Sequence, residues 1–359
     1  MKKFLVFILI IINMTAILAL WGCCLSTYAN PATHPRMAIV GLAFPVILVA
    51  NVAMILPWLL VRKRLIMLPL VGMGVCYTFI RDYCPFNRTK EVSEGAIKVI
   101  TWNCHAYGNA TGASADEKWA NELTSYNYLK ECKADIICLQ EANGADHEER
   151  NAFEQSMDSA GYEKVATNGL TVFTKYHIAD TTDVRYHSRG SNSSLVCTLT
   201  RANDTLLLIN NHFESDQIST DHEADYHDAI TNPNESNLKA LGITFVDLLS
   251  EAASVRSQQI DSVATLVQEH QGWHIIVCGD FNDTPISFTH RTVAEGLTDC
   301  YIETANGPGL SYNQKGFNVR IDNILCSSHF TPFNCRVDNK IHASDHYPIY
   351  CWLKFGYKP

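Results

Sequence analysis

The first 90 residues carry apolar stretches far longer than any in the rest of the chain. Three such stretches occur, at residues 4–22, 38–61 and 65–80. The hydrocarbon core of a bilayer takes about 20 apolar residues per helix, so the first two can span it and the third is only marginally long enough. A cleaved signal peptide would account for the first stretch but not for the second. The pattern therefore predicts that residues 1–90 form a membrane anchor of two or three transmembrane helices.

Beyond residue 90 the apolar runs become short and alternate with polar and amphipathic segments. Helical spacing of apolar residues predicts helices over 118–133, 148–160 and 238–270. Strand-forming runs lie at 169–178, 193–200 and 205–210, with a hairpin turn at 202–204 between the last two. Strands that alternate with helices, together with a hairpin, are typical of a mixed α/β domain, which we predict for residues 91–359.

Several of the short apolar runs end in a polar residue suited to chemistry. The clearest is HIIVCGDFNDTP, in which Gly279 breaks a strand-forming run and Asp280 and Asn282 follow. Residues two apart on an extended chain point the same way, so both side chains would reach one sheet edge. Other runs of this kind end in Asn103, Glu141, Asn210 and His212, Asp322, and Asp345 and His346. One such run is typical of an ordinary turn, whereas their repetition indicates a shared site.

In this order the strings resemble those of the endonuclease/exonuclease/phosphatase superfamily, which includes DNase I, abasic-site endonucleases, neutral sphingomyelinases and inositol polyphosphate 5-phosphatases. The resemblance covers about residues 97–354, and the whole pattern is most similar to bacterial membrane proteins of that superfamily. It implies a four-layer α/β sandwich, in which two packed, mainly antiparallel sheets are flanked by helices. The site is then expected where loops from both sheets converge.

Residue chemistry points the same way as the resemblance. Hydrolysis of a phosphoester requires neutralised phosphoryl charge, an aligned water and a proton for the leaving group. Hard oxygen ligands select Mg²⁺ or Mn²⁺, and Glu141 is the strongest candidate ligand because it is a lone carboxylate at the end of an apolar strand. The sequence offers no evident Ser or Cys nucleophile with a partner base. Direct attack by water is therefore favoured over a covalent intermediate.

The resemblance implies catalytic roles for five residues. Asp280 corresponds to the carboxylate that aligns or activates the attacking water, and Asn282 to an amide that polarises the phosphate. His212 corresponds to the histidine on the leaving-group side. His346 corresponds to a phosphate-binding acid or base, and Asp322 to the carboxylate that orients it, so we expect these two side chains to be in contact.

Binding roles are implied for a second set. Glu141 corresponds to the principal metal ligand, Asn103 to an Asn that helps to hold metal and phosphate, and Asp345 to a possible second metal contact. Asn210 is a candidate substrate contact beside His212. Arg320 is a candidate contact for a substrate anion, although a purely structural arginine explains that position equally well.

Two positions depart from the pattern of abasic-site endonucleases. His105 stands where the strand of Asn103 continues to an acidic residue in those enzymes, which puts a nuclease-type metal set in doubt. Asn323 stands where an aromatic residue often follows the aspartate of the RIDNIL string, which leaves substrate stacking open. Neither departure touches the core set of candidate residues.

Charge and cysteine content differ between the two parts of the chain. Residues 1–90 contain nine Lys and Arg and one acidic residue, whereas residues 91–359 contain 19 basic and 36 acidic residues. So acidic a domain attracts a polyanion poorly, which disfavours nucleic acid as a partner without excluding it. Nine of the 13 cysteines lie in the second part without the paired spacing of a zinc site, and we interpret most of them as small buried hydrophobic residues.

Basic residues near the apolar stretches predict the orientation of the anchor. Lys2 and Lys3 precede the first stretch and residues 62–64 separate the second from the third, whereas the loop at 23–36 holds a single Arg. The positive-inside rule then places the N-terminus in the cytoplasm. With three spans the large domain lies outside a bacterial inner membrane, and with two it lies in the cytoplasm.

These observations together predict a membrane-anchored, Mg²⁺-dependent phosphoesterase that hydrolyses a phosphate ester or diester. A nuclease that uses the same residues is the alternative enzyme, and a catalytically silent membrane-tethered binding module is the alternative of another class. The complete set of acid, amide and imidazole residues argues against the silent module. The polar segment at 214–237 is either a solvated surface loop or a lid beside the site.

Overall fold

The computed structural model describes residues 2–356 except for 109–113, 145–146, 189, 191, 202–203, 217–234 and 315–316. The chain forms two compact units. The first consists of Met1–Tyr83, Ser215–Gln258 and Pro285–Arg291, and the second of Cys84–Glu214, Gln259–Thr284 and Thr292–Pro359. The predicted division into 1–90 and 91–359 differs from these units in two ways. Residues 84–90 belong to the second unit, and two later segments belong to the first.

The first unit is built from apolar helices. They are α1 (Lys2–Ser26), α2 (Pro35–Leu42), α3 (Phe44–Ala53), α4 (Ile55–Val61), the 3-10 helix η1 (Lys63–Ile66), α5 (Met67–Val75) and α6 (Tyr77–Tyr83). Two helical stretches, Lys3–Ser26 and Phe44–Val61, are long and apolar enough to cross a membrane. The third predicted span is a pair of helical pieces bent by 69°, so it is either a broken span or a re-entrant segment.

Polar side chains within these apolar helices bond across helix pairs. The Trp58 indole donates to Asn13 Oδ1 at 2.9 Å, and Asn51 Nδ2 donates to the carbonyl of Ala16, also at 2.9 Å. Asn13 and Asn51 are both completely buried. Amides bonded across helices in this way stabilise helix packing inside a bilayer.

The second unit contains two six-stranded sheets. The first has the order β13-β14-β1-β2-β4-β3 and the second the order β5-β6-β7-β8-β12-β9. In the first sheet the strands are β1 (Ile97–Asn103), β2 (Ile136–Gln140), β3 (Glu163–Thr167), β4 (Leu170–Thr174), β13 (Phe330–Val337) and β14 (Ile349–Phe355). In the second they are β5 (His177–Arg185), β6 (Ser193–Arg201), β7 (Asp204–His212), β8 (His274–Asp280), β9 (Thr298–Asp299) and β12 (Asp322–Cys326).

Antiparallel pairing dominates both sheets. Among the pairs of described strands, the parallel ones are β1 with β2 and β7 with β8. The remaining elements are the hairpin β10 (Tyr312–Gln314) and β11 (Phe317–Val319) and the helices α7 (His105–Gly108), α8 (Ala115–Glu131), α9 (Glu148–Ser159), α11 (Glu235–Glu269), α12 (Phe288–Val293) and α13 (Cys300–Thr304). The predicted mainly antiparallel α/β sandwich is confirmed.

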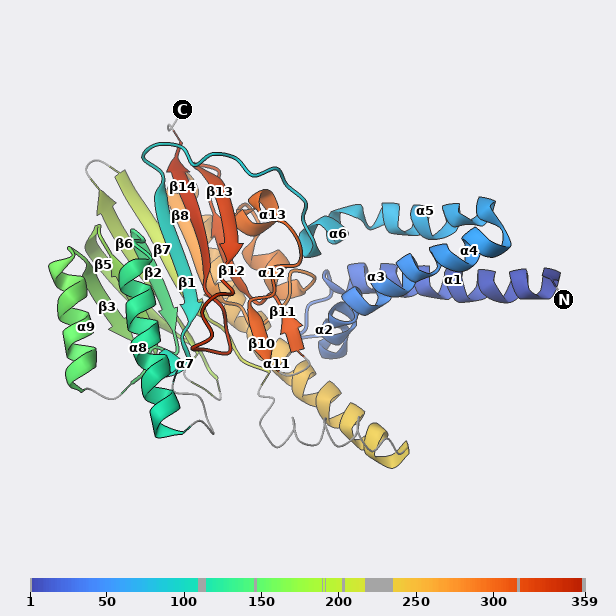
Figure 1. Ribbon diagram of the computed structural model, residues 1–359, viewed down its shortest axis with the longest axis horizontal. Helices are drawn as coiled ribbons and strands as arrows, with labels where there is room; N and C mark the ends of the chain where they lie inside the picture. The colour runs from blue at the N-terminus through green and yellow to red at the C-terminus, as the bar shows by residue number, and fades with distance from the viewer. Residues whose placement is uncertain are drawn as a thin grey trace. The chain divides into compact units, whose positions relative to one another are not determined.

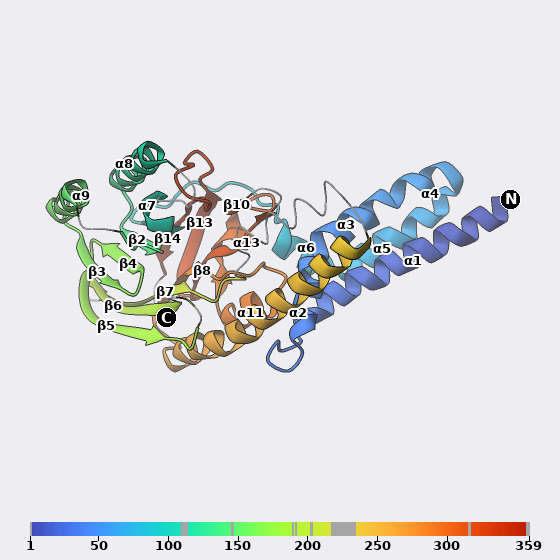
Figure 2. The same cartoon turned by 90° about the horizontal axis from the view of Figure 1, so that it is seen from below.

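Helices cover the sheets on their outer faces. Helices α8 and α9 lie over the first sheet (Figure 1), where Leu129 and Phe153 pack with Ile137 and Trp102 of the strands. The end of α11 runs along the second sheet (Figure 2), and its residue Val263 is completely buried. The main core lies between the sheets and forms the layer that fixes the strand ends relative to one another.

One predicted strand is in fact two. The run at 169–178 is divided between β4 of the first sheet and β5 of the second, because the chain leaves the first sheet after Lys175, whose backbone N–H donates to the carbonyl of Asp135. The crossover, Thr174–His177, contains neither Gly nor Pro, so the sequence gave no signal for a break between two strands. Two residues of the predicted turn at 202–204 and most of the predicted loop at 214–237 lie outside the described residues.

The core between the sheets is rich in thiols. All 13 cysteines of the chain are free, and seven of them belong to this core: Cys138, Cys197, Cys278, Cys300, Cys326, Cys335 and Cys351. The Cys300 and Cys326 sulfur atoms lie 3.6 Å apart, in contact but not bonded covalently. The interpretation of most cysteines as small buried hydrophobic residues agrees with this packing.

Candidate functional site

Strand register brings the predicted residues to one edge of the sandwich. Parallel pairing places Asn103 opposite Gln140, the residue before Glu141, and His212 opposite Asp280. Antiparallel pairing places Asp322 opposite Asp280 on the other side of β8. Because the two sheets pack face to face, the ends of β1 and β2 approach the ends of β7, β8 and β12.

Asp280 lies at the centre of this edge and is only 1% exposed. Asn103 Nδ2 donates to its Oδ2 at 3.1 Å, and the Nε2 atoms of His346 and His212 lie 3.8 and 4.0 Å from the same oxygen. Burial raises the pKa of Asp280 to about 6, with His346 opposing the rise and Asp322 adding to it. One carboxylate oxygen thus receives groups from three other chain segments.

His346 and Asp322 form a buried hydrogen-bonded pair, as predicted. The Nδ1 atom of His346 lies 2.8 Å from Asp322 Oδ2, and the residues are 4% and 0% exposed. Burial by itself lowers the pKa of His346, but the charges of Asp322 and Asp280 outweigh it and raise the pKa well above its ordinary value. The Tyr312 ring packs edge-on against the imidazole, and the Trp102 indole donates to the His346 carbonyl. The imidazole ring is thus held by Asp322 and Tyr312, and the His346 backbone by Trp102.

Glu141 stands at the open side of the site, with its side chain 40% exposed. Asn103 Nδ2 donates to Glu141 Oε1 at 3.0 Å, and His212 Nε2 lies 3.6 Å from the same oxygen. The Asn103 amide therefore bridges the Glu141 and Asp280 carboxylates. Since its nitrogen faces both acids, the predicted metal contact of Asn103 through its oxygen would require the carboxamide to turn.

Backbone strain is concentrated at the site. Glu141, Asn282 and His105 have φ values of 51°, 50° and 43°, in the left-handed region that residues with side chains seldom adopt. Gly279 precedes the central aspartate with a φ of 127°, and a Cβ there would lie 2.0 Å from the Asn211 carbonyl oxygen. Sharp reversals at the strand ends thus turn the functional side chains into the site.

Asp345 contacts His105 rather than the central carboxylate. His105 Nδ1 lies 3.3 Å from Asp345 Oδ1 and 4.0 Å from Glu141 Oε2. Burial raises the pKa of Asp345, but the hydrogen bond with His105 and the charges of His346 and His105 hold it below its ordinary value. His105 thus links the predicted second metal contact to the principal one.

Two predicted substrate contacts lie away from the open side. Asn210 is completely buried, and its amide bonds Gln140 Nε2 and the Leu139 carbonyl inside the sandwich. Arg320 is 1% exposed and packs on the Tyr301 ring, 4.4 Å from its centroid. Their positions do not support the predicted substrate contacts, because both side chains point into the protein interior.

The Asn282 side chain uses only part of its hydrogen-bonding capacity within the protein. Its backbone N–H donates to Asp280 Oδ1 at 2.8 Å, and its Nδ2 donates to the Phe213 carbonyl at 2.9 Å. One of the two N–H bonds of the amide is thus committed to the protein. The other remains for the predicted interaction with phosphate.

Three neighbours of the site were not among the predicted site residues. His105 could have been included because it follows Asn103 by two positions in the same string. Ser344 donates to the Asn103 carbonyl at 2.8 Å and accepts from the His346 N–H, which joins the end of β1 to the loop that carries His346. Tyr312 packs on His346 from the β10–β11 hairpin, and nothing in its local sequence sets it apart.

The oxygen-rich donor set fits a divalent cation. Donor atoms of Asp280, Asp322 and His346 all lie within 4.8 Å of one another, and the Asn103 amide connects this group to Glu141. Among the described residues, the ion-pair partners of Glu141 and Asp280 are histidines, and no Lys or Arg pairs with either carboxylate. A cation would offset this concentration of negative charge.

Comparison with protein families yields two matches. A model described as the Endonuclease/Exonuclease/phosphatase family matches residues 100–346, and a model of a domain of unknown function matches residues 3–83. No curated protein matches the chain. The first match contains every predicted site residue.

Solved structures share the fold at low identity. The Endonuclease/Exonuclease/phosphatase family protein from Bacteroides thetaiotaomicron has 15% identity and a TM-score of 0.50, covering 75% of this chain and 100% of its own. Sphingomyelinase C from Streptomyces griseocarneus has 15% identity and a TM-score of 0.51, covering 72% and 99%. The human nocturnin catalytic domain with bound sulfate has 16% identity and a TM-score of 0.50, covering 74% and 96%. These likenesses show the fold of the second unit.

Proposed function

Because this chain belongs to the endonuclease/exonuclease/phosphatase family of hydrolases that act on phosphoester bonds, we propose that it hydrolyses a phosphate ester or diester by direct attack of water, with Mg²⁺. The observation that carries the proposal is the convergence on Asp280, where Asn103, His212 and His346 come from separate segments to one carboxylate oxygen. Burial of a charged carboxylate costs folding free energy, and clusters of buried titratable groups therefore occur preferentially at functional sites.

Each side chain has a role consistent with its surroundings. Asp280 accepts the proton of the attacking water, since its carboxylate is buried and acts as a stronger base than an exposed one. His346, held by Asp322, donates a hydrogen bond to a phosphoryl oxygen. His212 stands beside both Asp280 and Glu141, within reach of a leaving group.

Glu141 is the residue we propose to hold the cation, with Asn103 beside it and Asp345 linked through His105. When bound, the ion would supply charge neutralisation for the phosphoryl oxygens. Family members depend in general on a divalent metal, and the half-exposed carboxylate of Glu141 is open to solvent on the side from which an ion can enter.

Mg²⁺-dependent turnover of model phosphoesters is the expected result for the full-length protein in detergent. Bis(p-nitrophenyl) phosphate, p-nitrophenyl phosphate, a phospholipid and single- and double-stranded DNA are assayed with Mg²⁺ and with EDTA. Asp280→Asn should lower turnover by about 10²-fold to 10⁴-fold, because it removes the base without changing volume. The exposed Asp158→Asn on α9 is the matched control and should behave as wild type.

The panel also tests the alternatives. Turnover of DNA alone, in preference to every small ester, would replace the proposal by a nuclease, against the excess of acidic residues in this part of the chain. If no ester is hydrolysed with either Mg²⁺ or Mn²⁺, the proposal fails and the catalytically silent binding module is the remaining alternative.

We further propose that the chain is a multi-pass protein of a bacterial inner membrane with the hydrolase domain outside the cytoplasm. Two helices of the first unit can cross a membrane, and basic residues flank them on the side predicted to be cytoplasmic. The proposal requires the bent pair from Lys63 to Tyr83 to act as one further span.

Cys84 offers a direct test of this topology. Among the 13 cysteines it is the exposed one, and it follows α6 directly. A membrane-impermeant maleimide should label the protein in intact spheroplasts, and Cys84→Ser should abolish the labelling. Labelling only after the membrane is permeabilised would put the domain in the cytoplasm.

A further inference from the structure

A segment of the first unit follows the central carboxylate of the site almost directly in the chain. Asp280 ends β8, and residues 281–284 alone separate it from Pro285–Arg291, which belongs to the first unit. The Asn282 N–H donates to Asp280 Oδ1 at 2.8 Å, and the other three residues of this connection are buried. Because buried, close-packed chain transmits displacements, a shift of Pro285–Arg291 reaches Asn282 and Asp280.

Ile286 is packed into the core of the first unit. It is 1% exposed and belongs to an apolar cluster with Leu20 and Cys23 of α1, Phe44 of α3 and Cys76. These partners lie more than 200 positions earlier in the chain. The start of the segment is thus held by the apolar helices of the first unit.

The backbone of the segment approaches α2 closely at Gly41. Gly41 is buried, and a Cβ there would lie 2.5 Å from the Ile286 carbonyl oxygen and 3.2 Å from Ser26 Oγ. A backbone carbonyl cannot rotate away as a side chain does, so a larger residue at Gly41 would push the segment out of place. A Cβ added at Gly22 of α1, by contrast, would meet no neighbouring group within 4 Å.

Arg291 holds the far end of the segment. Its guanidinium carbon lies 3.8 Å from the centroid of the Tyr28 ring, in the loop after α1. The Tyr28 ring in turn packs edge-on against Phe79 of α6, with 6.4 Å between the centroids. A cation over an aromatic face is attracted to the ring, so this contact restrains the segment at the end opposite to Ile286.

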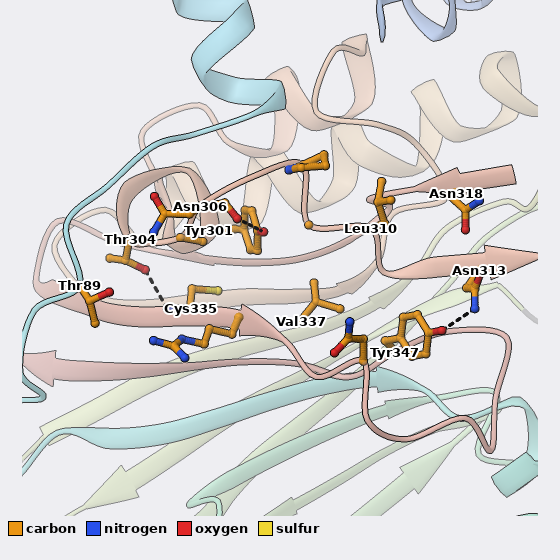
Figure 3. A pocket seen from close by; sticks show the side chains of 15 residues that line it. Thr89, Tyr301, Thr304, Asn306, Leu310, Asn313, Asn318, Cys335, Val337 and Tyr347 are labelled. Atoms are coloured by element: carbon orange, nitrogen blue, oxygen red, sulfur yellow. Dashed lines mark hydrogen bonds between the residues drawn. The ribbon is translucent and has the colours of Figure 1, made fainter.

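The His346 side of the site is braced within the second unit instead. The Asn313 N–H, in the β10–β11 hairpin, donates to the Asp345 carbonyl at 2.9 Å, and the Asn313 side chain donates to the Tyr347 hydroxyl (Figure 3). These bonds hold the residues on both sides of His346. A shift of the segment after Asp280 should therefore disturb Asp280 and leave His346 in place.

We propose that the first unit positions the catalytic carboxylate: its helices hold Pro285–Arg291, and this segment holds Asn282 and Asp280 in the orientation that hydrolysis requires. The proposal rests on the proposed phosphoester hydrolysis and adds residues that act through Asp280 rather than on the substrate. These positioning residues are Tyr28, Gly41, Ile286 and Arg291. Hydrolysis then depends on the fold of the first unit, because a misplacement of about 1 Å can cost about 10²-fold in rate.

Turnover of bis(p-nitrophenyl) phosphate by the full-length protein in detergent with Mg²⁺ measures this dependence. Gly41→Val should lower kcat about tenfold or more and change KM by less than about twofold, because Asp280 acts in the chemical step while His346 still contacts the phosphate. Gly22→Val is the matched control, the same change at a helix position with room for it, and should behave as wild type. Equal kinetics of the two variants would overturn the proposal.

The contact between Arg291 and Tyr28 provides a second test, which decides the matter if Gly41→Val does not fold. Arg291→Gln and Tyr28→Leu should each lower kcat about threefold, and the double variant should lower it no further, because both changes remove one contact. Tyr28→Phe keeps the ring and should retain the wild-type kcat. Losses that multiply, or a Tyr28→Phe variant as slow as Tyr28→Leu, would contradict the proposal.

Hydrogen exchange followed by mass spectrometry in EDTA separates the positioning proposal from the proposed function. A peptide covering 281–291 should exchange about tenfold faster in Gly41→Val than in Gly22→Val, and a peptide covering 345–349 should exchange equally in both. If wild type hydrolyses no ester but this pattern holds, the link between the first unit and Asp280 stands and the proposed function fails. Faster exchange confined to 286–291, with none at 281–284, would overturn the link itself.

Discussion

Removal of both Asp322 and His346 is expected to cost little more activity than removal of either one. The imidazole is useful only while its ring is fixed and protonated, and Asp322 provides both conditions through the 2.8 Å contact. Without the carboxylate the ring loses its orientation, and without the ring the carboxylate has nothing to orient. Each single change to Ala should therefore lower kcat by about 10²-fold to 10⁴-fold, and the double change should add less than about tenfold.

The measurement is a double-mutant cycle on kcat at saturating Mg²⁺, with thermal unfolding followed in parallel. The parallel measurement is needed because either deletion leaves a buried, unpaired partner, which lowers stability. Asp322→Asn keeps the volume and a hydrogen-bonding group, so it serves as the folded reference. Losses that multiply in the double variant would show that the residues act independently and that Asp322 is a strand-end acid without a catalytic connection.

Glu141→Gln is expected to have a comparably large effect through a different route. The change removes one negative charge at constant volume, and the charge of Glu141 is the feature that attracts a cation. Loss of several kcal/mol of charge stabilisation corresponds to a fall of about 10²-fold to 10³-fold in turnover at limiting Mg²⁺. Calorimetric titration with Mn²⁺ should show weakened binding in the same variant.

Glu131→Gln at the end of α8 is the control for this prediction, because Glu131 is exposed on the same unit and lies outside the site. It should retain wild-type turnover and Mn²⁺ affinity. Undiminished turnover of Glu141→Gln at limiting Mg²⁺ would remove Glu141 from the metal site, and weakened binding by both variants would point to a general effect of charge.

The sequence allowed the site edge to be predicted because sheet register is a local rule. Asp280 and His212 are the last residues of β8 and β7, and Asp322 is the first residue of the antiparallel strand β12, so pairing brings all three to one edge of the sheet. The contact between Asp322 and His346 was expected from the family resemblance, which assigns Asp322 as the acid that orients this imidazole, and it is present in the structure. The residue pattern predicted a mixed α/β domain and the strands that carry these residues, whereas the mainly antiparallel sandwich was predicted from the family resemblance.

Depth within the sandwich was not predictable from the same pattern. Asn210 and His212 lie on one face of β7 two residues apart, yet Asn210 bonds inside the core and His212 reaches the site. Alternation specifies the face of a strand and not the distance from its end. Arg320 was ambiguous for a similar reason, because its stacking on Tyr301 depends on a residue 19 positions away.

Contacts made by hairpins distant in the chain could not be predicted from the sequence either. Tyr312 packs on His346 through pairing between a hairpin and a loop, and neither segment has a periodic pattern. Composition likewise gives no sign that two later segments, Ser215–Gln258 and Pro285–Arg291, belong to the helical unit. The third apolar stretch was predicted to be only marginally long enough for a span, and in the structure a 69° bend divides it into two helical pieces.

The thiol-rich core also limits the conditions under which the chain can fold. In the folded domain burial shields the sulfur atoms of this core from oxidants, and it also raises the pKa of Cys197 to about 12. An unfolded chain has no such protection, and nine exposed thiols in an oxidising compartment would cross-link at random. Outside the cytoplasm, unfolding would therefore be a one-way step, and the lifetime of the hydrolase would be set by its unfolding rate rather than by its equilibrium stability.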